Sequence, residues 1–145
     1  MDRWVVDGYT EFSKRLPPEC RLNLIEIPVS KRSRNHDIDQ LINQEGERML
    51  SAIPNNSLIT ALDVVGKSWS TLELARNLDG WLHGGRDVSL LIGGPDGLSS
   101  ACKAKAELTW SLSNLTLPHA LVRIVVAEQV YRAWSVLKRH PYHRS

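Results

Sequence analysis

Cysteine is scarce in this chain. Only Cys20 and Cys102 occur, far apart in the sequence, and neither belongs to a CxxC pair or has a pair of histidines nearby. This spacing disfavours a structural zinc site, so we expect no metal and two buried free thiols. Long apolar runs are lacking as well: none approaches the ~18 residues that a membrane span needs, and no signal peptide opens the chain. We therefore expect a cytoplasmic protein with no membrane contact.

Two nucleotide-binding signatures are missing too. There is no GxGxxG after a first strand and no GxxxxGK[ST], which disfavours a Rossmann dinucleotide site and a P-loop. The hydrolase motifs GxSxG and HExxH do not occur either. A nucleotide-like ligand would therefore need a site of another kind.

Acidic residues are lacking in the last part of the chain. The net charge of +2 is too small to argue for a nucleic-acid partner by itself, but its distribution is uneven. No acidic residue follows Glu128, whereas Arg132, Lys138, Arg139 and Arg144 do. Such an asymmetry suits a polyanionic partner.

The length of the chain, its hydrophobic content and its alternating pattern of strands and helices predict an α/β protein. A chain of 145 residues with 42% hydrophobic residues fits a single domain, residues 1–145, with a real core. Because strands alternate with helices throughout, we expect a mostly parallel sheet. The predicted helices are one that ends at Pro17-Pro18, 37–52, one from the Ser70 capping box to His83, one from Ser99 or Ser100 to Ala106, and 119–137. The predicted strands are 22–27, 58–63, 88–92 and 108–112, with a loop over 66–69.

The last predicted helix has two apolar stripes. One contains Ile124, Ala127, Tyr131 and Trp134, and the other contains Val126, Val130, Ala133 and Leu137. A helix of a single domain usually needs one buried face. Two faces suggest burial against its own sheet and against a second subunit.

Three loops lie at the carboxyl ends of predicted strands. They begin after Leu62-Asp63, after Ile92 and after Leu112. Ligands of parallel sheets collect at the carboxyl ends of the strands, so the loops could surround one ligand. In the second loop Gly93 and Gly94 let backbone approach closely. Residues 113–118, SNLTLP, suit an adenine-like group held by backbone hydrogen bonds between apolar walls. The alternatives are a tight turn after Ile92 and a connection whose leucines fill the core.

Two further segments carry candidate chemistry. The tail Tyr142-His143-Arg144 combines a titratable imidazole with a fixed cation, although a frayed terminus is the more common structure there. The basic run from Lys31 to His36 could hold phosphates or could be a solvated loop. Of the five tryptophans, Trp69 is the best candidate for stacking on a base, while core or interface anchoring is the alternative.

Taken together, SLLIGGPDGLS, SNLTLPH and YRAW…HPYHR resemble the RlmH family of bacterial methyltransferases. The similarity covers residues 2–145 and includes LIEIP, EGE and GRDVSLLIGGP, in order and spacing. The resemblance implies a SPOUT-type parallel sheet with a C-terminal trefoil knot, and a homodimer. It also implies S-adenosylmethionine as methyl donor and methylation of N3 of a pseudouridine in the helix 69 loop of 23S rRNA, within the ribosome.

The resemblance also implies where the methyl donor binds, and the chemistry of the reaction indicates candidates for the other roles. The methyl donor would contact nine residues: Leu62, Gly93, Gly94, Leu112, Ser113, Asn114, Leu115, Thr116 and Leu117. The catalytic candidates are His143 for proton removal, with Tyr142, Arg144 and Arg132 beside it; an ion pair with Glu128 is the alternative role of Arg132. The candidates for rRNA contacts are Lys31, Arg32, Arg34 and Arg139.

The chain departs from the family at its start. Family members resemble it only after an additional N-terminal strand, whereas here Met1 to Trp4 fall where their first helix begins. We therefore expect a SPOUT fold without the family's first strand, through truncation or a misassigned start. Two alternative functions follow: a non-catalytic ribosome- or rRNA-binding protein, and another SPOUT methyltransferase that acts on tRNA.

Overall fold

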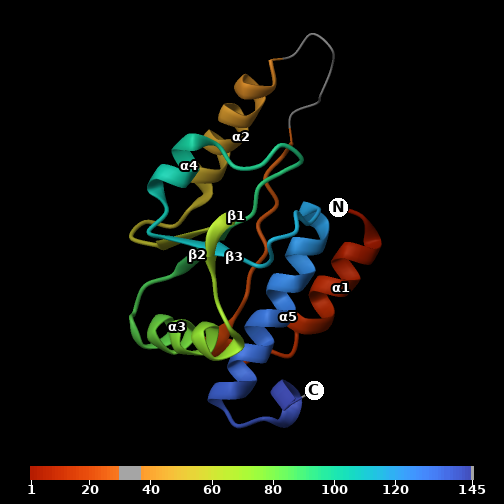
Figure 1. The fold of residues 1–145 in the computed structure, drawn as a ribbon, viewed down its shortest axis with the longest axis vertical. Coiled ribbons are helices and arrows are strands. Elements are labelled where there is room, and N and C mark those ends of the chain that lie inside the picture. The colour runs from red at the N-terminus through yellow and green to blue at the C-terminus, as the bar shows by residue number, and fades with distance from the viewer. Residues whose placement is uncertain (30–36, 145) are drawn as a thin grey trace. The chain divides into compact units, whose positions relative to one another are not determined.

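The computed structural model describes residues 1–29 and 37–144, drawn in Figure 1. The chain divides into two compact units made of interleaved segments. We call Met1–Asn23, Ser68–Gly85 and Ala120–Ser145 the helical unit, and Leu24–Lys67 with Arg86–His119 the sheet unit. Within the described ranges, no helix is both long and apolar enough to cross a membrane.

The sheet unit is built on three strands, β1 (Leu58–Ser68), β2 (Val88–Leu91) and β3 (Leu108–Ser111), in the order β2-β1-β3. β1 and β2 are parallel, in a register that runs from Leu58↔Val88 to Ala61↔Leu91. The amide of Glu107 donates to the carbonyl of Ile59 at 2.8 Å, just before β3. The first half of the central strand is deeply buried: Thr60 and Ala61 are inaccessible to solvent, whereas Val65 further along is 82% exposed. The predicted α/β class with a parallel sheet is confirmed.

β1 is longer than predicted. The strand was expected to end at Asp63, with a loop over 66–69, but it continues to Ser68. Gly66 lies against β3, where an added Cβ would be 2.7 Å from the carbonyl carbon and oxygen of Thr109. The glycine that suggested a loop instead allows two backbones to approach closely within the sheet.

The strand predicted over 22–27 is wrong. The structure has no regular element from Arg21 to Val29, and Ile25 is 60% exposed. Side chains rather than a neighbouring strand satisfy carbonyls here: the Tyr9 hydroxyl donates to Leu22 at 3.3 Å, and Arg48 donates to Pro28 at 3.1 Å. The apolar alternation alone could not show whether a strand lies beside the segment, and none does among residues 1–29 and 37–144.

Two helices complete the sheet unit, α2 (Ile38–Ala52) and α4 (Ser100–Lys105). Both are capped by side chains: Asp37 accepts from the Asp39 amide at 2.9 Å, and Ser99, one of the two serines expected there, accepts from the Cys102 amide at 3.1 Å. The two helices contact each other. Gly46 faces Ser99 and Cys102 so closely that no side chain would fit there without a shift.

The helical unit contains α1 (Arg3–Ser13), α3 (Thr71–His83) and α5 (His119–Leu137), with short 3-10 helices η1 (Pro18–Cys20) and η2 (Pro141–Arg144). The capping box of Ser70 and Glu73 opens α3 as predicted. α1 and α5 lie side by side (Figure 1), and an added Cβ on Gly8 would be 2.7 Å from Ile124.

Cys20 and Cys102 are both buried and free, which confirms the prediction for the thiols.

Both stripes of α5 contribute buried residues. Val126, Val130 and Ala133 are buried from one stripe, and Ala127 and Tyr131 from the other. The doubly apolar character of this helix is therefore used within the chain itself. Its expected contact with a second subunit stays a prediction.

Candidate functional site

The loop after β2 is a tight turn held by glycine. The amide of Gly97 donates to the carbonyl of Gly94 at 3.1 Å, and Gly97 has a φ of 87°. A Cβ on Gly93 would lie 2.7 Å from the Gly97 carbonyl carbon and 2.8 Å from the Leu98 nitrogen. Since both atoms belong to the backbone, they cannot rotate away. Gly93 is thus required for the loop to pack on itself, whatever else the loop contacts.

Leu62 lies beside the start of this turn. The register pairs Ala61 with Leu91, so the next residues, Leu62 and Ile92, leave the paired region together. Asp63 follows with a side chain that is 14% exposed and forms an ion pair with Lys103 of α4 at 3.4 Å. The pair ties α4 to β1 directly after Leu62.

The loop after β3 is ordered by two serines. The Ser111 hydroxyl donates to the carbonyl of Ser113 at 3.0 Å, and the Ser113 hydroxyl accepts from the amide of Leu115 at 2.9 Å. Leu112, Ser113 and Leu117 are half-buried, while Asn114, Leu115 and Thr116 are exposed. Leu115 is 72% exposed, so the alternative that both leucines of this loop fill the core is wrong for Leu115.

All nine residues expected to contact the donor belong to the sheet unit. They occupy three neighbouring places: β1 at Leu62, the turn after β2, and the loop after β3. Because β1 lies between the other two strands, both loops extend from strands that flank Leu62. The structure thus places these segments on neighbouring strands, and their binding of one ligand stays a prediction.

The tail is an ordered element, not a frayed end. Pro141–Arg144 form η2, and the Tyr142 hydroxyl donates to Oε2 of Glu128 at 2.9 Å. The same oxygen accepts from Nε of Arg132 at 2.9 Å, so the alternative ion pair of Arg132 is present. The Arg132 guanidinium carbon also lies 4.9 Å from the centre of the Tyr142 ring. Arg132 and Tyr142 are therefore brought together through Glu128.

The environment of Tyr142 favours its neutral form. Burial raises the pKa of the Tyr142 phenol, and the hydrogen bond to Glu128 raises it further. The cations Arg132 and Arg15 oppose this shift in pKa without reversing it. At neutral pH Tyr142 is thus a hydrogen-bond donor.

His143 and Arg144 differ in their surroundings. Nδ1 of His143 is buried and has no hydrogen-bond partner in the described structure, whereas Arg144 is exposed. Arg139 is exposed and adopts a left-handed conformation with φ 56°. Lys31, Arg32 and Arg34 lie outside the described residues.

Trp69 packs edge-on against Trp81 at 6.3 Å between ring centres, as expected for an anchoring residue.

Comparison with known proteins shows the family to which this chain belongs. Residues 1–143 match the family model described as "Predicted SPOUT methyltransferase". The chain belongs to the SPOUT methyltransferase family. It is similar to three proteins named "Ribosomal RNA large subunit methyltransferase H", and the resemblance to the RlmH family is thereby confirmed. The relative from Thioalkalivibrio sulfidiphilus is 58% identical over 99% of this chain and 92% of its own length. The relatives from Methylococcus capsulatus and Marinomonas sp. are 57% and 53% identical, each over 99% of this chain and 93% of theirs.

Two contributors to the tail of this SPOUT protein were missed from the sequence. Glu128 was considered only as an ion-pair partner, yet it accepts from three side chains, Gln129, Arg132 and Tyr142. Arg15 of α1 lies 5.4 Å from the Tyr131 ring centre and 6.0 Å from that of Tyr142. The spacing of Glu128 and Arg132 gave a signal for the first, but nothing in the sequence pointed to Arg15.

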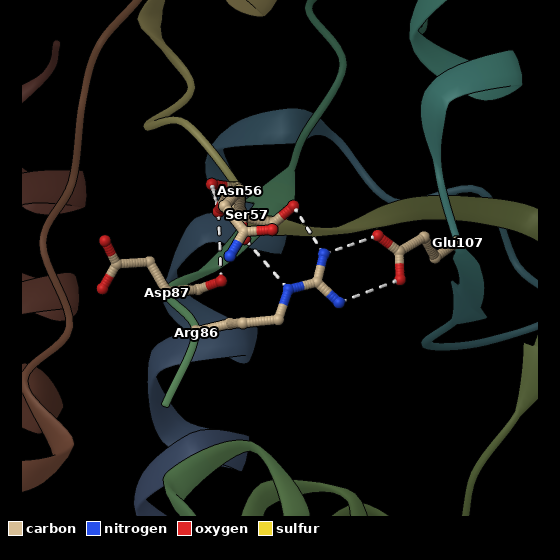
Figure 2. Close-up of polar contacts among 6 residues, drawn as sticks. Asn56, Ser57, Arg86, Asp87 and Glu107 are labelled. Carbon is tan, nitrogen blue, oxygen red and sulfur yellow. Dashed lines mark hydrogen bonds and ion pairs between the residues drawn. The ribbon is translucent and has the colours of Figure 1, made fainter. Parts of the chain in front are cut away.

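The amino ends of the three strands are joined by Arg86 (Figure 2). Its guanidinium donates to Glu107 at 2.9 and 3.4 Å, to the Asn56 carbonyl at 2.9 Å and to the Ser57 carbonyl at 3.3 Å. The Ser57 hydroxyl in turn donates to the carbonyl of Asp87 at 3.2 Å. These contacts fix the strands at the edge opposite to the candidate loops. We find no cluster of three metal-ligating side chains in the ranges that the structure describes.

Proposed function

We propose that this protein is an S-adenosylmethionine-dependent methyltransferase that modifies N3 of a pseudouridine in helix 69 of 23S rRNA. The observation that carries the proposal is the 58% identity, over 99% of the chain, to a protein named as a large-subunit rRNA methyltransferase. The target atom and nucleotide come from the family resemblance. We further propose that the protein acts as a homodimer with a C-terminal trefoil knot.

Three segments of the sheet unit are the proposed site for the methyl donor. Leu62 and Leu117 are half-buried and Leu115 is exposed, so apolar surface is available for an adenine ring. Gly93, Gly94 and residues 112–117 present backbone donors and acceptors beside it. Bound there, S-adenosylmethionine would supply an electrophilic methyl group on a positively charged sulfur.

The reaction is a direct displacement that needs an aligned acceptor and the loss of one proton. A bond forms between N3 and the methyl carbon, the carbon–sulfur bond breaks, and its electron pair stays on sulfur. His143 would take the N3 proton, as the imidazole base of the tail beside Arg144. Arg144 and Arg132 would stabilise the anion or hold the neighbouring phosphate. Tyr142, kept neutral, would hold the tail in place.

Basic residues would bind the rRNA backbone. Lys31, Arg32, Arg34 and Arg139 are the proposed contacts. Such contacts release counterions, so binding should weaken steeply as salt is added.

The decisive experiment offers the protein and labelled S-adenosylmethionine to intact ribosomes, separated subunits and tRNA from cells that lack the modification. We expect one methyl group on 23S rRNA and none on tRNA, located by mass spectrometry of nuclease fragments. Calorimetric titration with S-adenosylmethionine is run in parallel. Donor binding with methyl transfer only to tRNA would identify a SPOUT methyltransferase whose substrate is tRNA and not rRNA. Ribosome binding without donor binding would identify a non-catalytic rRNA-binding protein.

His143→Ala tests the proposed base. We expect turnover to fall by about 10²-fold or more, the usual contribution of a general base, with unchanged donor affinity. Unchanged turnover would remove His143 from the reaction. The weakly acidic imide would then lose its proton to water.

A further inference from the structure

The turn between α5 and η2 has a defined geometry. Arg139, with φ 56°, donates its amide to the carbonyl of Val136 at 3.2 Å, and the His140 amide donates to Ser135 at 2.8 Å. These two bonds with a left-handed residue form a Schellman-type helix end. The turn therefore fixes the backbone of His140 against the last turn of α5.

The His140 side chain then acts on the tail. Its Nδ1 accepts a hydrogen bond from the backbone amide of Tyr142 at 3.2 Å. Pro141, the first residue of η2, has no amide hydrogen, so the Tyr142 amide is the first donor of this short helix. The imidazole ring also contacts Tyr131 and Trp134, with ring centres 6.2 and 6.3 Å away. His140 thus caps η2 from a position held by α5.

Tyr142 is consequently held at two points. Its amide is bound by His140, and its hydroxyl is bound by Glu128. Only one peptide bond separates Tyr142 from His143. The orientation of the buried, unpartnered Nδ1 of His143 therefore depends on the backbone that His140 fixes.

We propose that His140 is a positioning residue for the methyl-transfer reaction: it caps η2 through Nδ1 and so orients His143 and Arg144. The inference rests on the proposed function. It requires the acceptor at Nδ1, not the ring as such. Asparagine, a strong helix-capping residue with a side-chain oxygen, should therefore replace much of what histidine does.

The test compares His140→Ala, His140→Asn and the control Thr10→Ala, an exposed residue of α1 in the same unit. We expect His140→Ala to lower kcat by about tenfold, the kinetic equivalent of one lost cap. His140→Asn should recover most of the loss, and Thr10→Ala should leave kcat unchanged. Because the donor site lies in the sheet unit, the dissociation constant for S-adenosylmethionine should stay the same in all three variants.

A second readout needs no activity. Hydrogen exchange at the Tyr142 amide should accelerate roughly tenfold in His140→Ala, and should stay near the parent rate in His140→Asn. Unchanged exchange and kcat in His140→Ala would overturn the inference, as would equal loss in the alanine and asparagine variants with unchanged melting temperature. If the parent protein transfers no methyl group while exchange responds as expected, the proposed function fails and the capping role of His140 stands.

Discussion

The two units present their candidate residues in different ways. In the sheet unit the candidate donor site is made largely of backbone: a glycine turn closed by Gly94 and Gly97, and a loop ordered by Ser113. In the helical unit the tail is held by side chains that converge on Glu128. Substitutions at these candidate residues should therefore act through steric fit in the turn after β2, and through hydrogen bonds and charge in the tail.

The largest effect is expected at Gly93. In Gly93→Ala the new Cβ would meet the backbone of Gly97 and Leu98 below 3 Å. We expect a loss of about 1–3 kcal/mol in the free energy of unfolding, as in other overpacked sites, measured by urea titration. Donor binding should weaken as well, measured by calorimetry.

Gly94→Ala is the matched control for that turn. Its Cβ would meet only Oε2 of Glu45, at 3.4 Å, which is ordinary contact. We expect little change in stability. If both variants were equally stable, the steric account of the sheet unit would be wrong.

The next effect is expected at Arg86, where Arg86→Ala removes the contacts that join the amino ends of the strands. Arg86 and Glu107 are 36% and 48% exposed, so water screens their ion pair and limits its contribution. The carbonyls of Asn56 and Ser57 would also lose a charged donor. We expect a total loss of about 1–2 kcal/mol, measured by urea titration.

Arg86→Lys and Glu107→Gln separate these contributions. Lysine keeps the charge but cannot form the paired contact with Glu107. If the backbone contacts dominate, Glu107→Gln should cost less than Arg86→Ala. Equal costs would show that the ion pair carries the stability of this edge, because Arg86→Ala removes that pair as well.

A smaller effect of opposite sign is expected in the helical unit. Gly80 lies inside α3, and an added Cβ would meet nothing within 4 Å. Gly80→Ala should raise the free energy of unfolding by about 0.5–1 kcal/mol because alanine favours the helix. Gly84→Ala, whose Cβ would lie 3.1 Å from the Gly80 carbonyl oxygen, should give no such gain in melting temperature. A loss of stability in Gly80→Ala would contradict the open surroundings of this position.

The smallest effect at neutral pH is expected at Tyr9. Burial raises the pKa of the Tyr9 phenol from 10 to about 12. Below pH 10 both the folded and the unfolded chain keep this proton, so the stability is unaffected. Between pH 10 and 12 the unfolded chain releases it while the folded chain does not, and stability falls as pH rises. In Tyr9→Phe the fall measured by urea titration across this window should be shallower. An unchanged slope would show that Tyr9 does not contribute.

Features set by neighbouring residues could be predicted from the sequence. The capping box at Ser70 and Glu73 fixed the start of α3, and the apolar pattern of α5 gave both its ends. The positions of the candidate loops after β2 and β3 were also predictable, because each follows a short apolar run.

Features that depend on distant partners could not be predicted. Whether residues 22–27 join a sheet depends on a neighbouring strand, and Gly66 reads as a turn until Thr109 is placed beside it. The capping role of His140 was missed for the same reason: it appears only once the helix end turns the chain back. The tail motif indicated candidate catalytic residues, but not what holds them.

The packing of α1 on α5 has a consequence for how this chain is made. Gly8 contacts Ile124, so an element near the start of the sequence has its partner near the end. On the ribosome, N-terminal elements emerge first and usually fold as their own domain is completed. Here α1 must wait for α5 to emerge before its buried face is covered. The helical unit therefore completes its folding only when nearly the whole chain has been synthesised.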